Sequence, residues 1–327
     1  MTKKLFDINP ALAGVFGDSL RYVTSIIEET DQTYPIKPEL WDNWFTFAYL
    51  AFQKFHKKIK SFASIGTGPG ADAIGAHCAF PDLERIIITD INHDVVDVAR
   101  GNVEIKTTGA EVVALCGNLC QPLMDAGLKA DLIYGNLPNI PEAGLIIEGY
   151  RTASRYDPKK VIDEKKFGLI DTSLHEKTKD FLQESQLAFL IDARESLNEW
   201  GSVIIALGGR VPLGLFYEMA QAAGYGHCDE LVAGFKRQTE PREILPGFAA
   251  AENNGVSFDF YRYRDVKNYL LSLGMKNPFT ELGGDVLKKA LGEFKLSARE
   301  AWNKYQRDNS FEIGHTVHMI EARKPIA

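Results

Sequence analysis

The sequence has little of what is typical of membrane, zinc-binding or nucleic-acid-binding proteins. No stretch of its 327 residues approaches the roughly 18 uninterrupted apolar residues of a membrane span, and its first residues lack the apolar core of a signal peptide. The four cysteines are scattered, without the spacing of a zinc site. A formal net charge of −7 without a basic stripe disfavours nucleic acid. We therefore expect a cytoplasmic protein with no membrane span, no metal and no nucleic-acid partner.

What the sequence does contain, from residue 61 onward, is an alternation of apolar runs with helical patterns. This alternation is typical of a doubly wound parallel sheet, so we predict an α/β fold with a mostly parallel, seven-stranded, Rossmann-like sheet. The expected helices include residues 94–107, 178–197 and 212–223. The expected strands are residues 62–65, 86–89, 111–116, 131–135, 201–208, 227–235 and 315–322.

Two regions fall outside this alternation. Before it, the apolar spacing of Ile8–Glu29 and Leu40–Ile59 predicts two helices joined by a proline-broken connection. Before the last strand, a long segment exceeds the length of an ordinary connection. The predicted division is a helical N-terminal cap (1–60), a cofactor-binding domain (61–235 with 314–327) and a substrate-side insertion (236–313).

A glycine loop follows the first of these strands. Gly66, Gly68 and Gly70 suit a sharp turn from strand to helix and a ligand lying against bare backbone. Asp90, about 20 residues further on, ends the next strand, where a carboxylate can accept both hydroxyls of a ribose. The spacing is G-x-G-x-G rather than the dinucleotide G-x-G-x-x-G, and Asp72 near the helix start disfavours a phosphate. S-adenosylmethionine, which has a positive sulfonium and no phosphate, fits better.

Two more loops follow the third and fourth strands, and all four loops converge at the carboxyl edge of such a sheet. They contain Gly117-Asn118-Leu119 and Asn136-Leu137-Pro138-Asn139-Ile140-Pro141-Glu142-Ala143. With these loops in order, the chain resembles the class I S-adenosylmethionine-dependent methyltransferases, and within them the protein-glutamine methyltransferases that modify release factors. The resemblance covers about residues 61–145. Members of that group carry Gly-Asp-Leu after the third strand and Asn-Pro-Pro-Tyr-Ile-Pro-Glu-Ala after the fourth.

The resemblance implies S-adenosylmethionine as cofactor and assigns roles to the loop residues. The implied catalytic residues, which position the acceptor nitrogen, are Asn136, Leu137, Pro138 and Asn139. The implied cofactor-binding residues are Gly66, Thr67, Gly68, Gly70, Asp90, Ile91, Asn118, Leu119 and Asn136. Asn118 replaces the family's acid at the adenine. Leu137 and Asn139 replace a proline and the aromatic ring that stacks on the acceptor.

The altered acceptor motif sets the expected function. We predict an N-methyltransferase that acts on an amide, amine or guanidine nitrogen of a small molecule or amino acid derivative, and the acidic composition suits a cationic substrate. Alternatives are a protein-glutamine N5-methyltransferase, a cofactor-binding regulatory protein without activity, and a nicotinamide oxidoreductase, which the glycine spacing opposes. Candidate substrate residues or bases outside the motif are Tyr34, which supplies a ring, Glu142, Glu148, Asp171 and His175.

Overall fold

The computed structural model describes residues 4–17, 25–139, 164–275, 279–280 and 284–325. At its centre is a ten-stranded sheet in which seven strands run in the order β5-β4-β3-β6-β7-β12-β8. All of them run in one direction except β12, which lies antiparallel between β7 and β8. The predicted α/β fold with a mostly parallel sheet is therefore confirmed. The bounds of the seven strands are β3 (Ser61–Ile65), β4 (Arg85–Asp90), β5 (Glu111–Cys116), β6 (Ala130–Gly135), β7 (Leu197–Gly208), β8 (His227–Arg237) and β12 (Ile313–Arg323).

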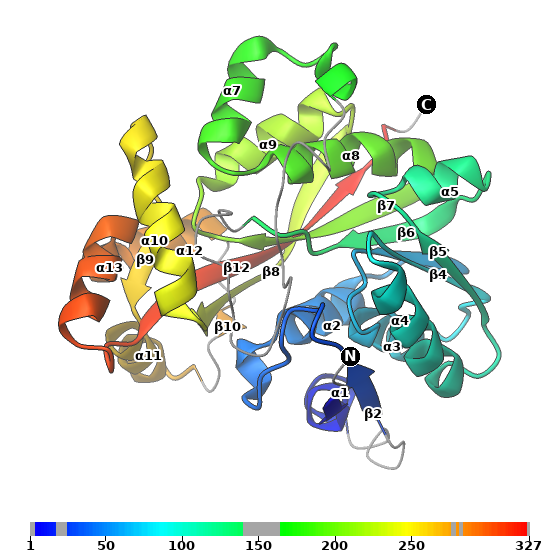
Figure 1. Cartoon of the computed structure of the whole chain (residues 1–327), viewed down its shortest axis with the longest axis horizontal. Helices are drawn as coiled ribbons and strands as arrows, with labels where there is room; N and C mark the ends of the chain where they lie inside the picture. Colours follow the sequence, from blue (N-terminus) through cyan, green and yellow to red (C-terminus); the bar gives the residue numbers. More distant parts are fainter. Residues whose placement is uncertain (1–3, 18–24, 140–163, 276–278, 281–283, 326–327) are drawn as a thin grey trace.

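Helices cover both faces of this sheet (Figure 1). One face carries α2 (Trp44–Lys54), α3 (Ala71–Ala79) and α4 (His93–Lys106), and the other carries α5 (Gln121–Asp125), α8 (Glu184–Ser196) and α9 (Leu213–Ala222). Because both faces are covered, the central strands are apolar almost throughout, and Ile86, Ile87 and Ile88 of β4 are all fully buried.

The expected helix over residues 178–197 is wrong in one respect. The structure has two helices there, α7 (Thr172–Asp180) and α8, and the chain breaks between them at Leu182, whose φ of +59° is left-handed. The amide of Gln183 donates to the carbonyl oxygen of Thr178 across this break, at 2.7 Å. A short 3₁₀ turn, η3 (Glu164–Phe167), precedes α7.

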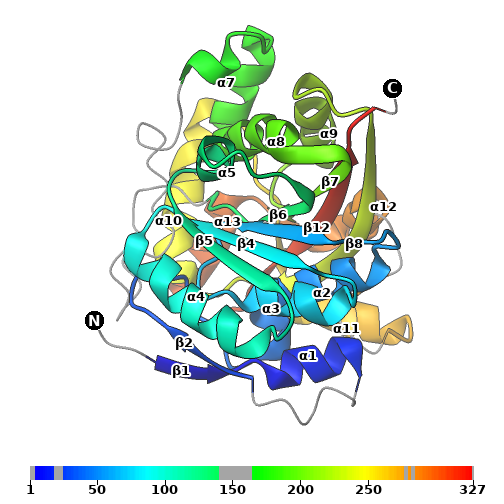
Figure 2. The ribbon, with the colours of Figure 1, turned by 90° about the vertical axis from the view of Figure 1, so that its right-hand side faces the viewer.

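The N-terminal region is less helical than the sequence predicts. Instead of one helix over Ile8–Glu29, the structure has strand β1 (Lys4–Asp7), helix α1 (Asn9–Phe16) and strand β2 (Ile26–Glu29), with β1 and β2 paired antiparallel (Figure 2). The second expected helix is reduced to the 3₁₀ turn η2 (Leu40–Asp42) and α2. β1 and β2 provide hydrogen-bond partners for each other's backbone, so pairing between distant residues, rather than local apolar spacing, decided their structure.

The N-terminal region packs directly behind the glycine loop. The side chain of Asn102 on α4 bonds the backbone of Glu28 in β2 in both directions, at 2.7 and 2.9 Å, and also donates to the carbonyl oxygen of Pro69 at 2.8 Å. On α3, a Cβ at Gly75 would lie 2.0 Å from the ring of Tyr49 on α2, so only glycine fits beneath that ring. The wall formed by residues 26–54 is therefore tied to the loop that we expect to bind the cofactor.

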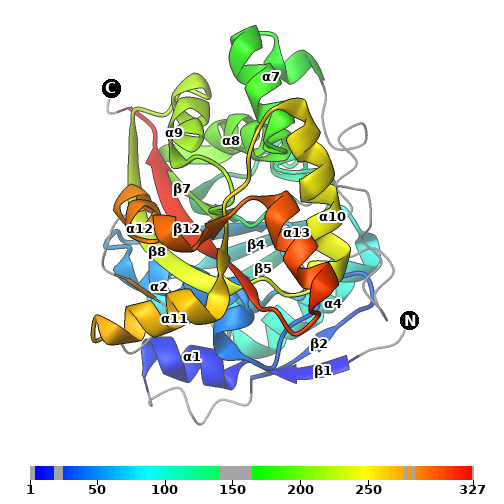
Figure 3. The same cartoon turned by 90° about the vertical axis from the view of Figure 1, so that its left-hand side faces the viewer.

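The segment before β12 adds helices and three short strands to one end of the sheet. Helices α10 and α13 lie against each other there (Figure 3). The division of the chain into three domains stays a prediction. These elements are α10 (Pro241–Ala251), η4 (Glu252–Asn254), β9 (Phe260–Arg262), α11 (Tyr263–Ser272), β10 (Phe279–Thr280), α12 (Gly284–Ala290), η5 (Gly292–Phe294), β11 (Lys295–Leu296) and α13 (Ala298–Arg307).

The sequence led us to expect neither a membrane span nor a metal site, and the described residues can be examined for both features. None of the helices among them has the length and apolar character needed to cross a bilayer. Within the same residues, no cluster of histidine, cysteine, aspartate or glutamate has the arrangement of a metal site. The location of the protein in the cell stays a prediction.

Candidate functional site

A cavity of about 730 Å³ lies at the carboxyl edge of the sheet, within the size range of small-molecule sites. Residues from the ends of β3, β4, β5 and β6 line it together with residues from the N-terminal region. The structure thus brings most of the predicted site residues to one place. Those that line the cavity are Tyr34, Gly66, Gly68, Asp90, Ile91, Asn118, Leu119, Asn136, Leu137, Pro138 and Asn139.

The glycine loop divides into residues that face the cavity and residues that support it. Gly66 and Gly68 line the cavity with φ of +65° and +53°, and a Cβ on Gly68 would meet no atom within 4 Å. Gly70 (φ +85°) packs instead against α4, where a Cβ would lie 2.8 Å from a methyl carbon of Val103. Thr67 is buried, and its amide donates to the carbonyl oxygen of Thr89 at 2.9 Å. Thr67 and Gly70, both predicted to bind cofactor, therefore hold the loop's shape from outside the cavity lining.

Asp72 occupies the start of α3 behind the loop. Its buried carboxylate accepts hydrogen bonds from the hydroxyl of Ser64 at 2.6 Å and from the amide of Ala73 at 2.9 Å. Burial raises the pKa of Asp72 to about 6. A carboxylate thus already fills this helix end, which agrees with the expectation that the loop does not bind a phosphate.

Asp90 links the glycine loop to the end of β4. Its two carboxylate oxygens accept hydrogen bonds from the amides of Gly68, at 3.3 Å, and Asn92, at 3.0 Å. Burial raises the pKa of Asp90. A carboxylate can accept about four hydrogen bonds, so acceptor capacity remains for ligand hydroxyls. Nearby, Leu119 keeps a φ of +48°, a backbone strain of the kind that clusters at ligand sites.

The predicted acceptor segment is held by the start of α8. The side-chain nitrogen of Gln186 donates to the carbonyl oxygen of Leu137 at 3.2 Å. The hydroxyl of Ser185 lies 3.2 Å from the carbonyl oxygen of Pro138. Both residues are buried. Asn136 lines the cavity, and its side chain makes no hydrogen bond to another described residue. Sequence reasoning placed Ser185 and Gln186 in a helix but gave them no role, since no spacing relates them to residues about 50 positions earlier.

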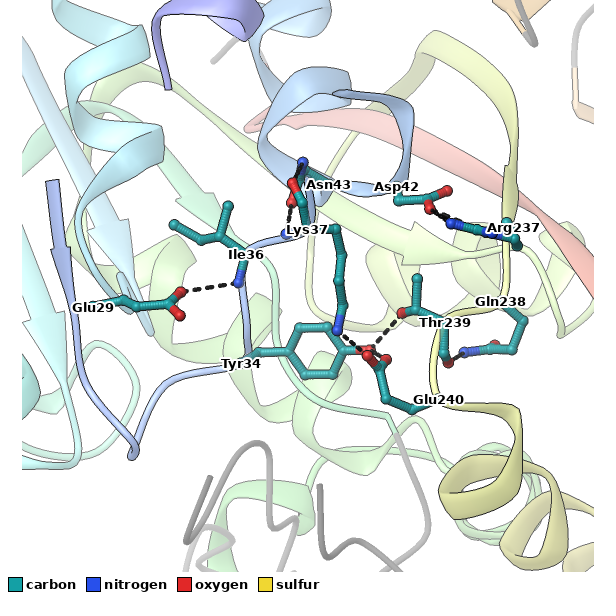
Figure 4. A network of polar contacts seen from close by, with 10 residues as sticks. All are labelled: Glu29, Tyr34, Ile36, Lys37, Asp42, Asn43, Arg237, Gln238, Thr239 and Glu240. Carbon is teal, nitrogen blue, oxygen red and sulfur yellow. Dashed lines mark hydrogen bonds and ion pairs between the residues drawn. The ribbon is translucent and has the colours of Figure 1, made fainter. Parts of the chain in front are cut away.

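An aromatic wall comes from the N-terminal region. Tyr34 and Trp44 line the cavity and meet edge to face, with ring centroids 6.0 Å apart. The hydroxyl of Tyr34 donates to a carboxylate oxygen of Glu240 at 2.5 Å and lies 3.0 Å from the hydroxyl of Thr239 (Figure 4). Burial raises the pKa of Tyr34. The cavity therefore contains a ring that the acceptor motif itself lacks, as the sequence suggested.

Two other predicted substrate residues lie elsewhere, and two cannot be placed. His175 on α7 is not among the residues that line the cavity: its ring stacks on Phe167 with centroids 4.3 Å apart, and its Nε2 lies 3.5 Å from a carboxylate oxygen of Glu184. Asp171 caps the start of α7 by accepting hydrogen bonds from the amides of Ser173 and Leu174. The interpretation of His175 and Asp171 as bases facing the substrate is thus not supported. Glu142 and Glu148 lie outside the described residues.

The other end of the cavity contains residues that sequence reasoning missed. Arg210, Lys236, Gln238 and His315 come from the ends of β7 and β8 and the start of β12. A Cβ on Gly208 would lie 2.5 Å from a guanidinium nitrogen of Arg210, so the arginine folds back over the end of its own strand. A basic surface of this kind disagrees with the expectation of a cationic substrate. The only available signal was that Arg210 and Lys236 stand at the ends of predicted strands.

Comparison with known proteins gives a partial match. No protein-family model matches the chain. The release factor glutamine methyltransferase of Staphylococcus aureus is 31% identical over 155 residues, which are 45% of this chain and 52% of that protein. The enzyme of the same name from Bacillus anthracis is 35% identical over 104 residues, 31% of this chain and 34% of that protein.

The chain resembles the release factor glutamine methyltransferases. This confirms the resemblance that the four loops indicated, although the match spans only about half the length of the first of these relatives and a third of the second.

Similar solved structures include a ribosomal protein L11 methylase from Lactobacillus delbrueckii subsp. bulgaricus (18% identity, TM-score 0.37, 59% of this chain and 74% of that chain). A methyltransferase from Pyrococcus furiosus has 16% identity and a TM-score of 0.41 over 68% of this chain and 87% of that chain.

Proposed function

We propose that this protein is an S-adenosylmethionine-dependent N-methyltransferase whose acceptor is the side-chain amide of a glutamine in a protein. The observation that supports this most directly is that Asn136–Asn139 lines the same cavity as the glycine loop and Asp90. The sequence similarity adds the second support, because relatives that match 45% and 31% of this chain are named release factor glutamine methyltransferases.

The residues at the β3–β5 end of the cavity fit the proposed cofactor. Asp90 supplies acceptors for ribose hydroxyls, Gly66 and Gly68 expose backbone without a Cβ in the way, and Asn118 offers an amide to an adenine edge. When bound, S-adenosylmethionine supplies a methyl group on a positively charged sulfur. A neutral glycine loop and a single acid suit that charge better than they suit a pyrophosphate.

The acceptor segment would hold a planar amide by hydrogen bonds. The side-chain oxygen of Asn136 and the carbonyl oxygen of Leu137 accept from the two N–H bonds of the substrate amide, which fixes the direction of the nitrogen. The carbonyl of Leu137 has a second lone pair for this, since Gln186 uses one. Asn136 and Leu137 would hold the acceptor nitrogen toward the methyl group that the cofactor supplies. The new nitrogen–carbon bond would form as the sulfur–carbon bond breaks, the sulfur would keep the electron pair, and the nitrogen would release its proton to solvent.

The choice of a protein substrate rests on the relatives rather than on the cavity. From the sequence alone, Leu137 and Asn139 favoured a small molecule, because they replace residues of the family motif. The matched relatives support the protein-glutamine alternative better. Tyr34 and Trp44 give the cavity aromatic surface, so the lost ring of the motif no longer argues strongly against an amide acceptor.

The test is methyl transfer from labelled S-adenosylmethionine to matched acceptors. We expect methylation of capped peptides that contain glutamine, and none of the same peptides with asparagine in its place, with the product located by mass spectrometry. The N136A variant should bind cofactor and lose turnover. Transfer to free amines or amino acids but not to peptides would establish a small-molecule enzyme. Cofactor binding without transfer to any acceptor would indicate a regulatory protein.

A further inference from the structure

Two cations line the end of the cavity farthest from Asp90 in the sheet. Arg210 is only 6% exposed, and Lys236 is half-buried. Among the described residues that line the cavity, Asp90 is the single carboxylate, and it belongs to the β4 end. The cavity is therefore polarised: its carboxylate, Asp90, lies at the β4 end, and its two cations, Arg210 and Lys236, lie at the end formed by β7, β8 and β12.

Neutral groups hold the guanidinium of Arg210. Its Nη1 donates to the side-chain oxygen of Asn139 at 3.2 Å, and its Nε donates to that of Gln238 at 3.3 Å. The ring of Phe248 lies 5.0 Å from its central carbon. Within the described part of the chain, Arg210 has no ion-pair partner, and its Nη2 donates to no group. An oriented guanidinium with free N–H bonds is the usual recognition element for a carboxylate.

Two carboxylates in this region, Asp42 and Glu240, are already paired with other cations (Figure 4). Asp42 accepts two hydrogen bonds from Arg237, at 2.5 and 3.1 Å. Glu240 pairs with Lys37 and the hydroxyl of Tyr34. Arg237 and Lys37 are thus neutralised by the protein. In the part of the chain that the structure describes, Arg210 and Lys236 form no ion pair.

The contact with Asn139 gives a reason for the altered acceptor motif. In the related group this position carries an aromatic residue, whereas here the amide oxygen of Asn139 accepts from Arg210. A phenyl ring has no such acceptor, and the oxygen of a phenol lies at the far end of its ring, several bonds beyond the place of the Asn139 oxygen. The change in the motif and the buried arginine therefore belong to the same arrangement, which places a positive charge in direct contact with Asn139, the last residue of the acceptor segment.

We propose that Arg210 and Lys236 bind a carboxylate of the methyl acceptor, so that the substrate is an amide that carries an acidic group close to the reacting nitrogen. This rests on the proposed function for the identity of the amide, but not for the existence of the anion site. The carboxylate could belong to an acidic residue beside the glutamine of a peptide, or to the backbone of a terminal or free glutamine.

The charge state of both residues suits this role near neutral pH. Burial lowers the pKa of Arg210 to about 10 and that of Lys236 to about 8. Both groups are therefore mainly protonated at pH 7, although the protein environment disfavours their charge. An anion that enters the cavity replaces the lost solvation of these charges, which an uncharged acceptor of the same shape cannot do.

The experiment measures binding, so that it does not depend on turnover. The full-length protein is saturated with S-adenosylhomocysteine and titrated by calorimetry with N-acetylglutamine and with its uncharged amide. A second pair of probes, capped peptides with glutamate or glutamine after the target glutamine, distinguishes a side-chain carboxylate from a backbone one. We expect the charged member of at least one pair to bind roughly 10- to 100-fold more tightly.

Three variants assign the preference to this site. R210M and K236M should each reduce the preference to about threefold or less, while S-adenosylhomocysteine affinity stays within a few fold. R262M removes a cation on β9 outside the cavity lining and should leave the preference intact. If R210M unfolds, K236M alone carries the test, because the side chain of Lys236 makes no hydrogen bond to a described residue and its loss therefore removes none from the folded protein.

Several results would overturn the proposal. Equal binding of charged and neutral probes by the wild type is one, and a preference that survives in both R210M and K236M is another. Glu142 and Glu148 lie outside the described residues, so E142Q and E148Q are included. If only these variants prefer the charged probe, then Glu142 or Glu148 neutralises Arg210 and Lys236 in the wild type, and the proposed site is not available to a substrate carboxylate. Anion binding that depends on Arg210 in a protein that methylates no glutamine would uphold this site and refute the proposed function.

Discussion

The two ends of the cavity differ in how their residues are distributed along the sequence. At the β3–β5 end, each wall is a short loop directly after a strand. The groups that these loops present are the backbone of the glycine loop and the carboxylate of Asp90. At the β7–β12 end, the guanidinium of Arg210 is positioned by side chains from three distant segments, Asn139, Gln238 and Phe248. The first end is thus specified by local sequence and the second by contacts between distant segments. This difference explains why motif spacing revealed the first end and not the second.

The largest expected effect is at the cofactor end. D90A should weaken S-adenosylmethionine binding by about 100-fold or more in calorimetry, because it removes a charged acceptor of two hydroxyl hydrogen bonds. G68V should do the same, since a branched residue at φ +53° is strained and its side chain enters the cavity. R210M is the matched control and should leave this affinity within a few fold. Unchanged affinity in both D90A and G68V would refute the assignment of the two ends.

The next effect separates the acceptor segment from the cofactor end. N136A should lower kcat by roughly 30- to 100-fold, because the acceptor nitrogen loses an orienting hydrogen bond, while cofactor affinity stays within a few fold. Equal losses of turnover and cofactor affinity would mean that Asn136 only maintains the structure of the loop.

A smaller effect is expected for the support of that segment. Q186L should lower kcat by about tenfold with little change in KM for the cofactor, since the carbonyl of Leu137 loses its fixed partner. L187A is the matched control, because this neighbour on α8 is equally buried but does not bond the motif. If L187A and Q186L reduce kcat alike at equal stability, general packing of α8 explains the effect and the hydrogen bond does not.

The smallest effect concerns the buried charge behind the glycine loop. The pKa of Asp72 is raised to about 6 in the folded chain, so the folded state holds a proton at pH 5 that the unfolded state has lost. Its contribution to stability is therefore lost as pH rises through 6. Relative to wild type, D72N should gain about 1 kcal/mol of unfolding free energy between pH 5 and pH 7, measured by urea denaturation.

The control for this titration is D131N. Although partial burial opposes it, hydrogen bonds from Asn198 and from the amides of Lys60 and Ser61 lower the pKa of Asp131 overall. Its contribution is therefore constant between pH 5 and pH 7, and the difference between D131N and wild type should not change with pH. A D72N difference that is equally flat would contradict the raised pKa.

The sequence predicted the sheet well because its signals there are local. The run Glu111–Cys116 forms a strand with those bounds, and six others lie within a few residues of their predicted limits. It failed where partners are distant or unmarked. β1 and β2 are four-residue strands whose backbones pair only with each other in the described residues. The break between α7 and α8 is at Leu182, where no glycine or proline marks it in the sequence.

The candidate site divides in the same way. Asp90 and the glycine loop could be identified from spacing alone, and Asn136–Asn139 from the resemblance. The role of Arg210 could not be identified, because a lone arginine after a strand usually lies in solvent, and its partner Asn139 is 71 positions earlier. Thr67 and Gly70 were assigned to the cofactor by pattern, yet their contacts show that they brace the loop.

The three hydrogen bonds of Asn102 join β2 and the glycine loop through one side chain. Detaching β2 at Glu28 removes a partner from the side chain that also holds the carbonyl of Pro69. Partial unfolding of the first strands therefore loosens the loop as well. We therefore expect the glycine loop and the β1–β2 pair, about 40 residues apart in the sequence, to lose their structure together when the protein begins to unfold.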